Sequence, residues 1–592
     1  MTILGVSALY HDSAAAVVQD GKIIAAAQEE RFSRKKGDAS IPVNAIKYCI
    51  ESVNTKIDQV VYYDNPFLTM DRWLTNIVDI SPDNAVIINK SFSNMMSNRL
   101  WIHEKLKKTL GSYWPEGTEL YVCEHHISHA ASAFYPSPFQ EAAILTIDGV
   151  GEWATTTIGY GNGEEIDIIR QINYPDSLGL LYSAFTYFCG FKVNSGEYKL
   201  MGLAPYGTPK YKKIILDNLI NILDDGTFAL NQEYFTYMRD VKIIGKEFEK
   251  LFGIEKRKPE SHLAKTYLDL AASIQAVIEE AILSLAKLAH KLTGSKNLVL
   301  AGGTALNCVA NGKIVSEEIF DNVWVQPAAG DAGGALGCAL YATYSLGENK
   351  RQIEYMDSQK GSYLGPAFTN EEIGNFLDKM KIVYHFYDND ELFRVIADYL
   401  AEDKVIGLHQ GRMEYGPRAL GNRSIIANPM SEHMQSKVNQ KIKFRESFRP
   451  FAPAVLAEDV SRYFDFKGTA SPYMLFTAPV KEELCLKVRE KSSYQDVYEM
   501  INEKRSVIPA VTHIDFSSRI QTVHKETNLF FYNLIRAFRD KTGCGIVLNT
   551  SFNVRGEPIV CTPNDAWKCF MHTDMDVLVI GNYLILKGEQ VK

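Results

Sequence analysis

Histidines and carboxylates in this sequence have the spacing of a metal site. Three of the 13 histidines lie in segment 124–130, where His125 and His129 are four residues apart. On a helix that spacing puts both imidazoles on one face, where they can bind one metal ion. Asp148 and Asp331 each follow an apolar run and would add carboxylate ligands. Such a set suits iron, manganese or zinc, and the alternative is a pair of buried or helix-capping histidines.

A second group of residues is basic. Three arginines stand among three glycines in segment 411–424, and four more cations stand among aromatic residues in segment 441–451. Polar stretches at 509–521 and 548–558 complete the group. Arginine binds phosphate through two parallel hydrogen bonds, and the chain as a whole is acidic, so this clustering is selective. It predicts a site for an anionic small molecule, whereas the alternative is a set of solvated basic faces.

Two other polar segments indicate less on their own. The charge run 28–36 has the composition of a solvated surface, and segment 196–207 combines glycines with a proline. The second composition is typical of a loop shaped against a ligand, but the spacing does not identify that ligand.

The elements that must position these residues come in two similar sets. Each set is a meander of three short apolar strands, and a polar turn follows its first strand. The first turn contains His11 and Asp12, and the second contains Asp148 and Gly149. The expected strands are 4–7, 14–18 and 22–27, followed by 144–147, 155–160 and 166–169. This repetition predicts an internal duplication.

Helix and strand patterns continue through the rest of the chain. Apolar residues with a period of 3.6 predict a helix over 267–292. We expect strands at 298–300 and 323–325, and a helix from about Ala305, directly after Gly302 and Gly303, which would offer free amides to a phosphate. The polar stretch 346–361 predicts a domain boundary. Beyond it we expect helices at 371–380 and 390–401 and strands at 382–386 and 405–408.

Composition excludes several classes of protein. The chain has 592 residues, a net charge of −8 and 46% hydrophobic residues, which argues against disorder and against non-specific nucleic-acid binding. We find no run of 18 apolar residues, so we expect no membrane span. Nine scattered cysteines without a C-x-x-C pair fit reduced thiols in a cytoplasmic enzyme.

Segments along nearly the whole chain resemble the O-carbamoyltransferase family that includes the nodulation-type enzymes and nebramycin 5′ synthetase. They run in one order from residue 9 to residue 560: LYHDSAAAVV, EERFSRKK, EHHISHAASAF, TIDGVGEW, GEYKLMGLAPYG, AGGTALN, GDAGGALG, YGPRALGNRS, FRESFRPFAP and LNTSFNVRGEPIV. One departure is Gly37, where relatives often have histidine after the lysine.

The resemblance implies an α/β protein of two domains. Residues 1–350 would have the duplicated fold of actin, sugar kinases and heat-shock chaperones, and would carry the metal site. Residues 360–592 would be a YrdC-like domain. That domain would convert carbamoyl phosphate and ATP into carbamoyl-adenylate, and the first domain would transfer the carbamoyl group to a hydroxyl of a small-molecule natural product or sugar.

The resemblance also implies residue roles. His125, His129, Asp148 and Asp331 would bind Fe(II). His11 would be the general base, with Asp12 and Lys36 positioning the substrate or adenylate. The nucleotide in the first domain would contact Gly149, Gly302, Gly303, Asn307, Gly333 and Gly334. Carbamoyl phosphate and ATP, with Mg²⁺, would contact Arg418, Arg423, Lys443, Arg445, Arg449, Arg519, Ser551 and Asn553. Which of Lys443 and Arg445 faces phosphate stays open.

Other functions fit parts of the sequence. A kinase or ATPase of the sugar-kinase fold would explain the duplicated meander but not the basic motifs. A tRNA threonylcarbamoyl-type enzyme is disfavoured by the acidic charge. The acceptor alcohol is not indicated, a homodimer is a family-level expectation, and segment 64–111 is either an acceptor-facing lid or ordinary helical packing.

Overall fold

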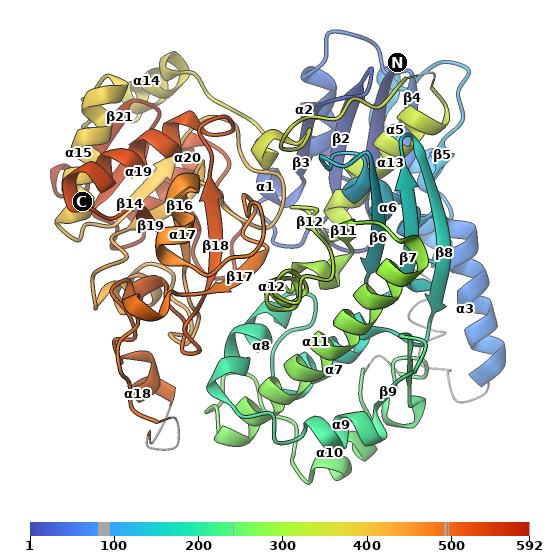
Figure 1. Cartoon of the computed structure of the whole chain (residues 1–592). Coiled ribbons are helices and arrows are strands. Elements are labelled where there is room, and N and C mark those ends of the chain that lie inside the picture. Colours follow the sequence, from blue (N-terminus) through green and yellow to red (C-terminus); the bar gives the residue numbers. More distant parts are fainter. Residues whose placement is uncertain (81–94, 241, 348, 491–493, 495–496, 591–592) are drawn as a thin grey trace. The chain divides into compact units, whose positions relative to one another are not determined.

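The computed structural model describes residues 1–80, 95–240, 242–347, 349–490, 494 and 497–590 (Figure 1). The chain forms two compact units. The first comprises residues 1–33 and 37–358, and the second comprises residues 34–36 and 359–592. A short basic segment from the N-terminal part of the sequence therefore belongs to the second unit.

The first unit contains two five-stranded sheets with the same topology. Their strand orders are β3-β2-β1-β4-β5 and β8-β7-β6-β11-β12. In each sheet three strands form an antiparallel meander, and two further strands run parallel to the first strand of that meander. The strands are β1 (Thr2–Ser7), β2 (Ala14–Gln19), β3 (Lys22–Gln28), β4 (Gln59–Tyr62), β5 (Tyr121–Val122), β6 (Glu141–Ile147), β7 (Ala154–Asn162), β8 (Glu165–Asn173), β11 (Asn297–Ala301) and β12 (Asn322–Val325). The repeat confirms the predicted duplication and the actin and sugar-kinase type of fold.

Helices pack on these sheets, and a small hairpin, β9 (Ile220–Ile222) with β10 (Phe228–Leu230), lies apart from them. The helices are α1 (Glu30–Ser33), α2 (Val43–Glu51), α3 (Pro66–Ile80), α5 (Ile102–Leu110), α6 (His125–Phe134), α7 (Leu178–Phe188), α8 (Glu197–Leu203), α9 (Lys212–Asn218), α10 (Lys246–Phe252), α11 (Lys265–Thr293), α12 (Cys308–Ser316) and α13 (Asp331–Ser345). The predicted long helix is confirmed as α11, which ends at Gly294 in the left-handed conformation that favours glycine.

Glycines bring α13 very close to its neighbours. A Cβ on Gly5 of β1 would lie 2.0 Å from the Ala335 carbonyl oxygen, and one on Gly337 would lie 1.8 Å from the Ser128 carbonyl oxygen. No larger residue fits either place without moving the backbone. This close packing sets α13 directly against both β1 and α6.

The second unit is built on one mixed sheet of nine strands, in the order β13-β21-β20-β14-β15-β19-β16-β18-β17. The pairs β14–β20 and β16–β18 are parallel, and the others are antiparallel. The strands are β13 (His385–Phe386), β14 (Ile406–His409), β15 (Arg423–Ala427), β16 (Ala452–Leu456), β17 (Phe476–Pro479), β18 (Ser517–Val523), β19 (Ile546–Ser551), β20 (Val577–Ile580) and β21 (Tyr583–Leu586).

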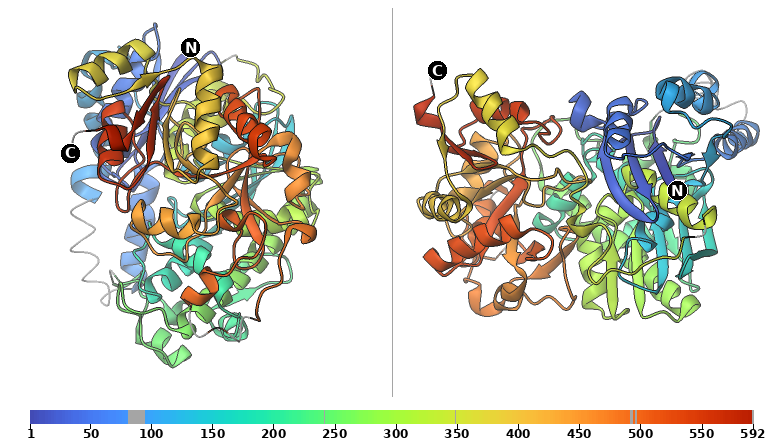
Figure 2. Two further views of the ribbon diagram at one scale, coloured as in Figure 1. Left: turned by 90° about the vertical axis from the view of Figure 1, so that its left-hand side faces the viewer. Right: turned by 90° about the horizontal axis from the view of Figure 1, so that it is seen from above.

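Helices pack on this sheet to enclose an apolar core. They are α14 (Asn370–Lys379), α15 (Asn389–Ala401), α16 (Met434–Lys441), α17 (Val460–Tyr463), α18 (Val497–Ile501), α19 (Leu529–Thr542) and α20 (Pro563–Met571). Helix α19 packs on β16 and against α15, whereas α20 packs on β14 and β20 (Figures 1 and 2).

Two local expectations are wrong. The segment predicted as a strand over 382–386 forms only the two-residue β13 (His385–Phe386). The chain after Gly302 and Gly303 does not enter an α-helix directly. It makes a 3₁₀ turn, Gly303–Leu306, and α12 starts only at Cys308, because the Asn307 side chain caps that helix by accepting from the Ala310 amide.

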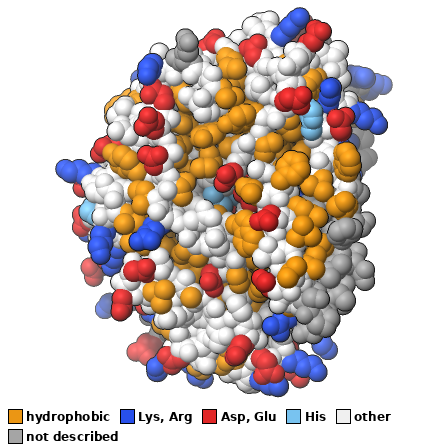
Figure 3. All heavy atoms as spheres, turned by 90° about the vertical axis from the view of Figure 1, so that its right-hand side faces the viewer, with side chains coloured by type: hydrophobic (Ala, Val, Ile, Leu, Met, Phe, Trp, Pro, Cys, Tyr) orange, Lys and Arg blue, Asp and Glu red, His pale blue; other side chains and the backbone are white. Residues whose placement is uncertain are grey.

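Helix α3 exposes apolar side chains beside polar ones such as Asp71, Thr75 and Asp79. Phe67, Leu74 and Val78 of that helix are exposed, and Figure 3 shows hydrophobic side chains spread over the face on which α3 lies. Segment 64–111, for which a lid and ordinary helical packing were the two alternatives, includes α3 and α5, while its part 81–94 lies outside the described residues. No helix among the described residues has the length and apolar character needed to cross a membrane.

Candidate metal centre and anion-binding site

The four predicted metal ligands come from the ends of three elements of the first unit. His125 and His129 lie one turn apart on the first turns of α6, Asp148 directly follows β6, and Asp331 is the first residue of α13. All four side chains are buried, and their ligand atoms lie within 4.8 Å of one another. The structure therefore brings together residues that are far apart in the sequence.

Distances within this cluster fit a shared cation. The Nε2 atoms of His125 and His129 are 3.1 Å apart. Asp148 Oδ2 lies 3.1 Å from the first of them and 3.6 Å from the second. Asp331 Oδ1 lies 3.8 Å from His125 Nε2. Two imidazoles and two carboxylates aimed at one point fit a divalent metal ion with room for a further ligand.

The two buried carboxylates of the cluster favour a positive charge beside them. Burial disfavours the charged form of His125, but the hydrogen bond to Asp148 and the charge of Asp331 outweigh burial and raise its pKa to about 10. For Asp148, burial is outweighed by the hydrogen bonds of His125 and His129, which hold its pKa well below the usual range. The carboxylates are thus stabilised by a nearby positive charge, which either a protonated histidine or a bound metal ion can supply.

Three residues that the sequence analysis missed support the ligands. The Tyr63 hydroxyl donates to Asp331 Oδ2 at 3.2 Å, and Asp64 Oδ1 lies 4.0 Å from His125 Nδ1. The Glu152 carboxylate accepts from the His125 amide at 2.8 Å and from the Asn65 amide at 2.7 Å. Glu152 therefore caps the start of α6, whose own N-cap residue makes no side-chain cap. Burial and the nearby Asp64 raise the pKa of Glu152 to about 7.

His11 and Asp12, predicted as catalytic, lie at the edge of this cluster. His11 Nε2 is 3.8 Å from Asp331 Oδ2, and His11 Nδ1 is 3.1 Å from Asp12 Oδ2. Asp12 has a positive φ of 52°. The charge of Asp331 raises the pKa of His11 to about 10. A cation bound to Asp331 would offset that charge and bring the imidazole back toward its ordinary range.

The glycines predicted to contact nucleotide serve close packing in this structure. A Cβ would lie 2.2 Å from the Ile147 carbonyl oxygen at Gly302 and 2.2 Å from the Ala328 carbonyl oxygen at Gly333. At Gly334 it would lie 2.5 Å from Tyr63 Cδ2. The Gly303 amide donates to Asp148 Oδ1 at 2.9 Å, which ties this loop to the metal cluster. By contrast, a Cβ on Gly149 would meet nothing within 4 Å.

Asn307 lies apart from the metal cluster. Its side chain caps α12 and exchanges hydrogen bonds with the Gln275 amide group, at 3.1 and 3.2 Å. Gln275 in turn donates to Glu279 Oε1 at 2.9 Å and accepts from the Tyr182 hydroxyl. Asn307 is therefore part of a buried polar network around α11.

A small cavity of about 120 Å³ lies behind the metal-binding helix, within the first unit. Glu152 and His126 line it together with residues of α3, β7 and β8. The face that α3 and β8 border is hollowed near its centre (Figure 3). Burial, together with His125 and His129, lowers the pKa of His126 well below its ordinary value, so this imidazole is neutral.

In the second unit, Lys443, Ser551 and Asn553 come together as predicted. The Lys443 ammonium donates to the Ser551 carbonyl at 2.7 Å and to Asn553 Oδ1 at 2.6 Å. It also lies 2.8 Å from the Asn553 carbonyl oxygen. Burial and the neighbouring charges of Arg445, Arg449 and Lys36 lower its pKa well below the usual range. A bound anion would reduce the electrostatic repulsion among these cations.

Arg445 and Arg449 flank this lysine but point to other partners. Arg445 Nε donates to Asn439 Oδ1 at 2.7 Å, and its guanidinium lies over the Phe451 ring. Arg449 faces Glu446 at 3.8 Å. Lys443 is thus the member of the pair Lys443 and Arg445 that reaches the Ser551 loop. Arg418, in the loop before β15, and Arg519, on β18, are both partly exposed.

Arg423, unlike the other predicted phosphate ligands, is surrounded by backbone carbonyl groups. Its guanidinium is fully buried and donates to a set of backbone carbonyls: those of Pro366, Gln410, Gly411, Asn422 and Cys561. Glu414, which the sequence analysis missed, accepts from the amides of Leu420, Asn422 and Arg423. These two buried charges shape the arginine-rich loop from inside.

Segment 34–36 supplies cations to the second unit. Arg34 donates to the carbonyls of Ile559 and Pro558, at 2.7 and 2.9 Å, in the loop that follows Asn553. Lys36 lies near enough to Lys443 to lower its pKa. Part of the charge run, whose composition is that of a solvated surface, thus lies in the candidate anion site of the second unit. The resemblance implied a role for Lys36 beside His11 and Asp12, whereas the structure groups Lys36 with Lys443.

Two family models together match most of the chain. The family model described as carbamoyltransferase N-terminus matches residues 2–340, and the one described as carbamoyltransferase C-terminus matches residues 397–587. An uncharacterised protein of Synechocystis sp. is 52% identical over 99% of this chain and 97% of its own length. The nodulation protein NolNO of Sinorhizobium fredii is 35% identical over 98% of this chain and 79% of its own length.

A solved structure similar to part of the chain is component A of the (R)-2-hydroxyglutaryl-CoA dehydratase of Acidaminococcus fermentans. It has 15% sequence identity and a TM-score of 0.31, and the match covers 58% of this chain and 99% of that one.

Proposed function

Because the chain belongs to the carbamoyltransferase family, we propose that it is an ATP-dependent O-carbamoyltransferase in which each unit performs one half of the reaction. The second unit would activate the carbamoyl group as carbamoyl-adenylate. The first would transfer that group to a hydroxyl of a small molecule. The acceptor would be a small-molecule natural product or a sugar.

The anion site of the second unit supports the first half. Water would release phosphate from carbamoyl phosphate, and a carbamate oxygen would then attack the α-phosphorus of ATP, so that pyrophosphate leaves. Charge grows on the phosphoryl oxygens during this attack, and cations offset it. Lys443, with Arg445, Arg449 and Lys36 nearby, is the observed concentration of cations that such a step requires.

The buried cluster of His125, His129, Asp148 and Asp331 carries the proposal for the second half. A divalent metal ion, for which we propose Fe(II), would act as a Lewis acid on the carbamoyl or phosphate oxygen. The His and Asp residues hold the ligand geometry, and Glu152 fixes the start of the helix that presents two of them. The glycine loop at Gly302 and Gly303, bonded to Asp148, would place the AMP part of the adenylate beside the cluster.

His11 is the group we propose to accept the proton of the acceptor hydroxyl. The hydroxyl oxygen would attack the carbamoyl carbon, AMP would leave, and the proton would move to the imidazole. Asp12, hydrogen-bonded to His11 Nδ1, orients the ring so that Nε2 faces the cluster. With Asp331 occupied by a cation, His11 would be neutral and able to act as a base.

The nucleotide products test this proposal. Purified protein incubated with ATP, Mg²⁺, carbamoyl phosphate and Fe(II) should form AMP and pyrophosphate only when carbamoyl phosphate is present. ADP formed without dependence on carbamoyl phosphate would contradict the proposal and favour a kinase of the same fold. If turnover requires the acceptor alcohol, carbamoyl-adenylate should remain bound to the enzyme in its absence. Mass spectrometry of the quenched enzyme should then detect it.

A further inference from the structure

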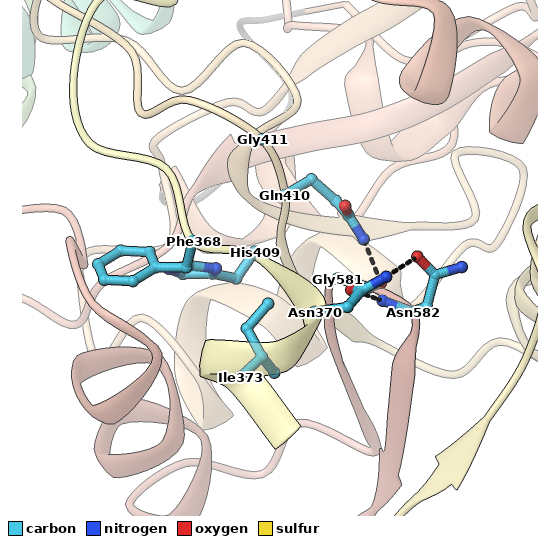
Figure 4. A pocket seen from close by; sticks show the side chains of 8 residues that line it. All are labelled: Phe368, Asn370, Ile373, His409, Gln410, Gly411, Gly581 and Asn582. Carbon is cyan, nitrogen blue, oxygen red and sulfur yellow. Dashed lines mark hydrogen bonds between the residues drawn. The ribbon is translucent and has the colours of Figure 1, made fainter. Parts of the chain in front are cut away.

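A second cavity, of about 190 Å³, lies in the second unit where β14 ends, at His409 and Gln410 (Figure 4). The Gln410 carbonyl accepts from the buried Arg423 guanidinium, so this cavity borders the arginine-rich loop and belongs to the site already described. A contact within the first unit, by contrast, has no part in the steps above. It joins Arg99 to the turn that carries His11.

The turn between β1 and β2, which carries His11, has a strained backbone. Leu9 and Asp12 have positive φ angles of 71° and 52°. In this left-handed region the Cβ of a residue approaches the following carbonyl oxygen, so leucine adopts it rarely. Such a conformation persists only where the surrounding structure holds it. The contacts of this turn therefore indicate what keeps His11 in place.

Backbone hydrogen bonds hold the two ends of this turn. The Leu9 amide donates to the Ala39 carbonyl at 2.9 Å, and the Ser13 amide donates to the Asp38 carbonyl at 2.8 Å. These two bonds do not reach residues 10–12, whose position depends on other contacts.

Arg99 reaches the turn from a distant part of the sequence. It is the last residue of the π-helical turn Met95–Arg99, shortly before α5. Its Nη2 donates to the Leu9 carbonyl at 3.2 Å, and its guanidinium carbon lies 4.0 Å from the centre of the Tyr10 ring. A planar guanidinium can stack on a ring and donate a hydrogen bond at the same time, whereas a lysine ammonium cannot stack in this way. Arg99 thus contacts the two residues that precede His11.

Ring contacts connect Arg99 to His11. The guanidinium covers the face of the Tyr10 ring, and the His11 ring meets that ring edge-on, with centres 6.2 Å apart and planes at 83°. His11 Nε2 in turn lies 3.8 Å from Asp331 Oδ2. A shift of the Tyr10 ring would therefore move the imidazole relative to the metal cluster.

The charges around Arg99 favour the same position. Burial disfavours the charged form of its guanidinium, but Tyr10 and the Asp64 carboxylate outweigh burial and raise the pKa of Arg99 above its ordinary value. Asp64 Oδ1 lies 4.0 Å from His125 Nδ1. Arg99 is thus close both to the turn of His11 and to a carboxylate beside the cluster.

We propose that Arg99 is a positioning residue of the first unit, which holds residues 9–12 in the conformation that directs His11 at the metal cluster. This inference rests on the proposed role of His11 as the base. Segment 95–110 thereby contributes to the active site without touching the reacting atoms. Sequence spacing gives no sign of this role, because Arg99 and Leu9 are 90 residues apart.

Hydrogen–deuterium exchange of the full chain tests whether Arg99 holds the turn. In Arg99→Met, which removes the charge and the hydrogen bond, the amides of residues 8–14 should exchange about tenfold faster than in the wild type, the effect of one lost hydrogen bond to a charged group. Arg99→Lys keeps a donor and should exchange at an intermediate rate. Lys108→Met removes an exposed cation from α5 and is the matched control, which should exchange as the wild type does. Unchanged exchange in Arg99→Met would overturn the proposal.

The rate of the transfer step tests whether this positioning serves the reaction. Enzyme-bound carbamoyl-adenylate, formed from carbamoyl phosphate and ATP, would be mixed with glycerol as the alcohol probe, and AMP release followed in a single turnover. Arg99→Met should form the adenylate as the wild type does but release AMP about 100-fold more slowly, the effect of a displacement of about 1 Å, with partial rescue in Arg99→Lys.

Two other results are informative. A role in stability alone would lower the Tm of Arg99→Met and leave its rate of AMP release unchanged, which would contradict the proposal. If the wild type forms no carbamoyl-adenylate, the proposed reaction fails, and the exchange experiment still decides whether Arg99 holds the turn.

Discussion

At the scale of single residues, the candidate metal centre depends on groups that do not bind the metal. His125 and His129 lie one turn apart on α6, but Glu152 caps that helix, Asp64 lies 4.0 Å from His125 Nδ1, and the Tyr63 hydroxyl donates to Asp331. Hydrogen bonds like those of Glu152 and Tyr63 orient metal ligands, and their loss typically weakens metal binding by about 10–100-fold.

Removal of a ligand should abolish metal binding. His125→Ala and Asp148→Ala each delete one of four converging groups, so the purified variants should contain far less metal than the wild type when reconstituted with Fe(II). Elemental analysis by mass spectrometry measures this. His262→Ala, an exposed histidine in the same unit, should keep its metal. Equal metal contents in all proteins would contradict the site.

The cap on α6 can be tested separately. Glu152→Gln keeps the size of the side chain but removes the carboxylate at the helix start. Because the pKa of Glu152 is raised to about 7, the loss should be seen above pH 7, where metal affinity should fall by about 10–100-fold while the protein stays folded. Competition with a chelator measures the affinity. Glu124→Gln is the matched control, because Glu124 is the exposed N-cap residue and makes no side-chain cap. An equal loss in both variants would argue against the role of Glu152.

Burial of His409 predicts a pH dependence of stability. Its pKa is lowered in the folded state, so below pH 6.5 the unfolded chain binds a proton that the folded chain does not. Stability should therefore fall as the pH drops below about 6.5, by up to about 1.36 kcal/mol per pH unit for one group. Urea unfolding of the full chain, with the second unit monitored by pulse proteolysis, measures its free energy of unfolding. Between pH 7 and 5.5 that free energy should decline less in His409→Gln than in the wild type.

At the scale of elements, close packing of α13 against α6 places Asp331 opposite the two histidines. This packing depends on glycines, because a Cβ at Gly337 would lie 1.8 Å from the Ser128 backbone oxygen. Both helices carry metal ligands in their first turns, so the distance between the helices sets the geometry of the site.

Gly337→Ala should therefore disturb both stability and metal binding. The added methyl group would push the helices apart, with a cost of about 1–3 kcal/mol typical of overpacking, and metal affinity should fall with it. Thermal unfolding and chelator competition measure the two effects. Gly330→Ala is the control, since a Cβ there meets nothing within 4 Å. Unaltered stability in Gly337→Ala would show that the backbone relaxes at no cost.

At the scale of the whole molecule, the chain consists of two units with different sites. The buried His and Asp cluster belongs to the first unit, and the cationic site around Lys443 belongs to the second. Each site has the charge that its proposed half of the reaction requires, negative for a metal ion and positive for phosphates.

Variants of the two sites should fail at different steps. His125→Ala should retain carbamoyl phosphate-dependent formation of enzyme-bound carbamoyl-adenylate but should not carbamoylate an acceptor. Lys443→Met should lose both, because the adenylate is no longer formed. Quenched-enzyme mass spectrometry and product analysis distinguish the two outcomes. Adenylate formation by Lys443→Met would contradict the assignment of activation to the second unit.

The sequence by itself determined most of the regular elements and the four members of the candidate metal cluster. Both meanders and α11 follow from hydrophobic periodicity, and His125 with His129 follows from helical spacing, since these are local properties of the chain. Only the tertiary structure decided the roles of Glu152, Glu414, Arg423 and segment 34–36, because each depends on partners distant in sequence. A buried charge is defined by the carbonyls and amides that surround it, and local sequence does not record those neighbours.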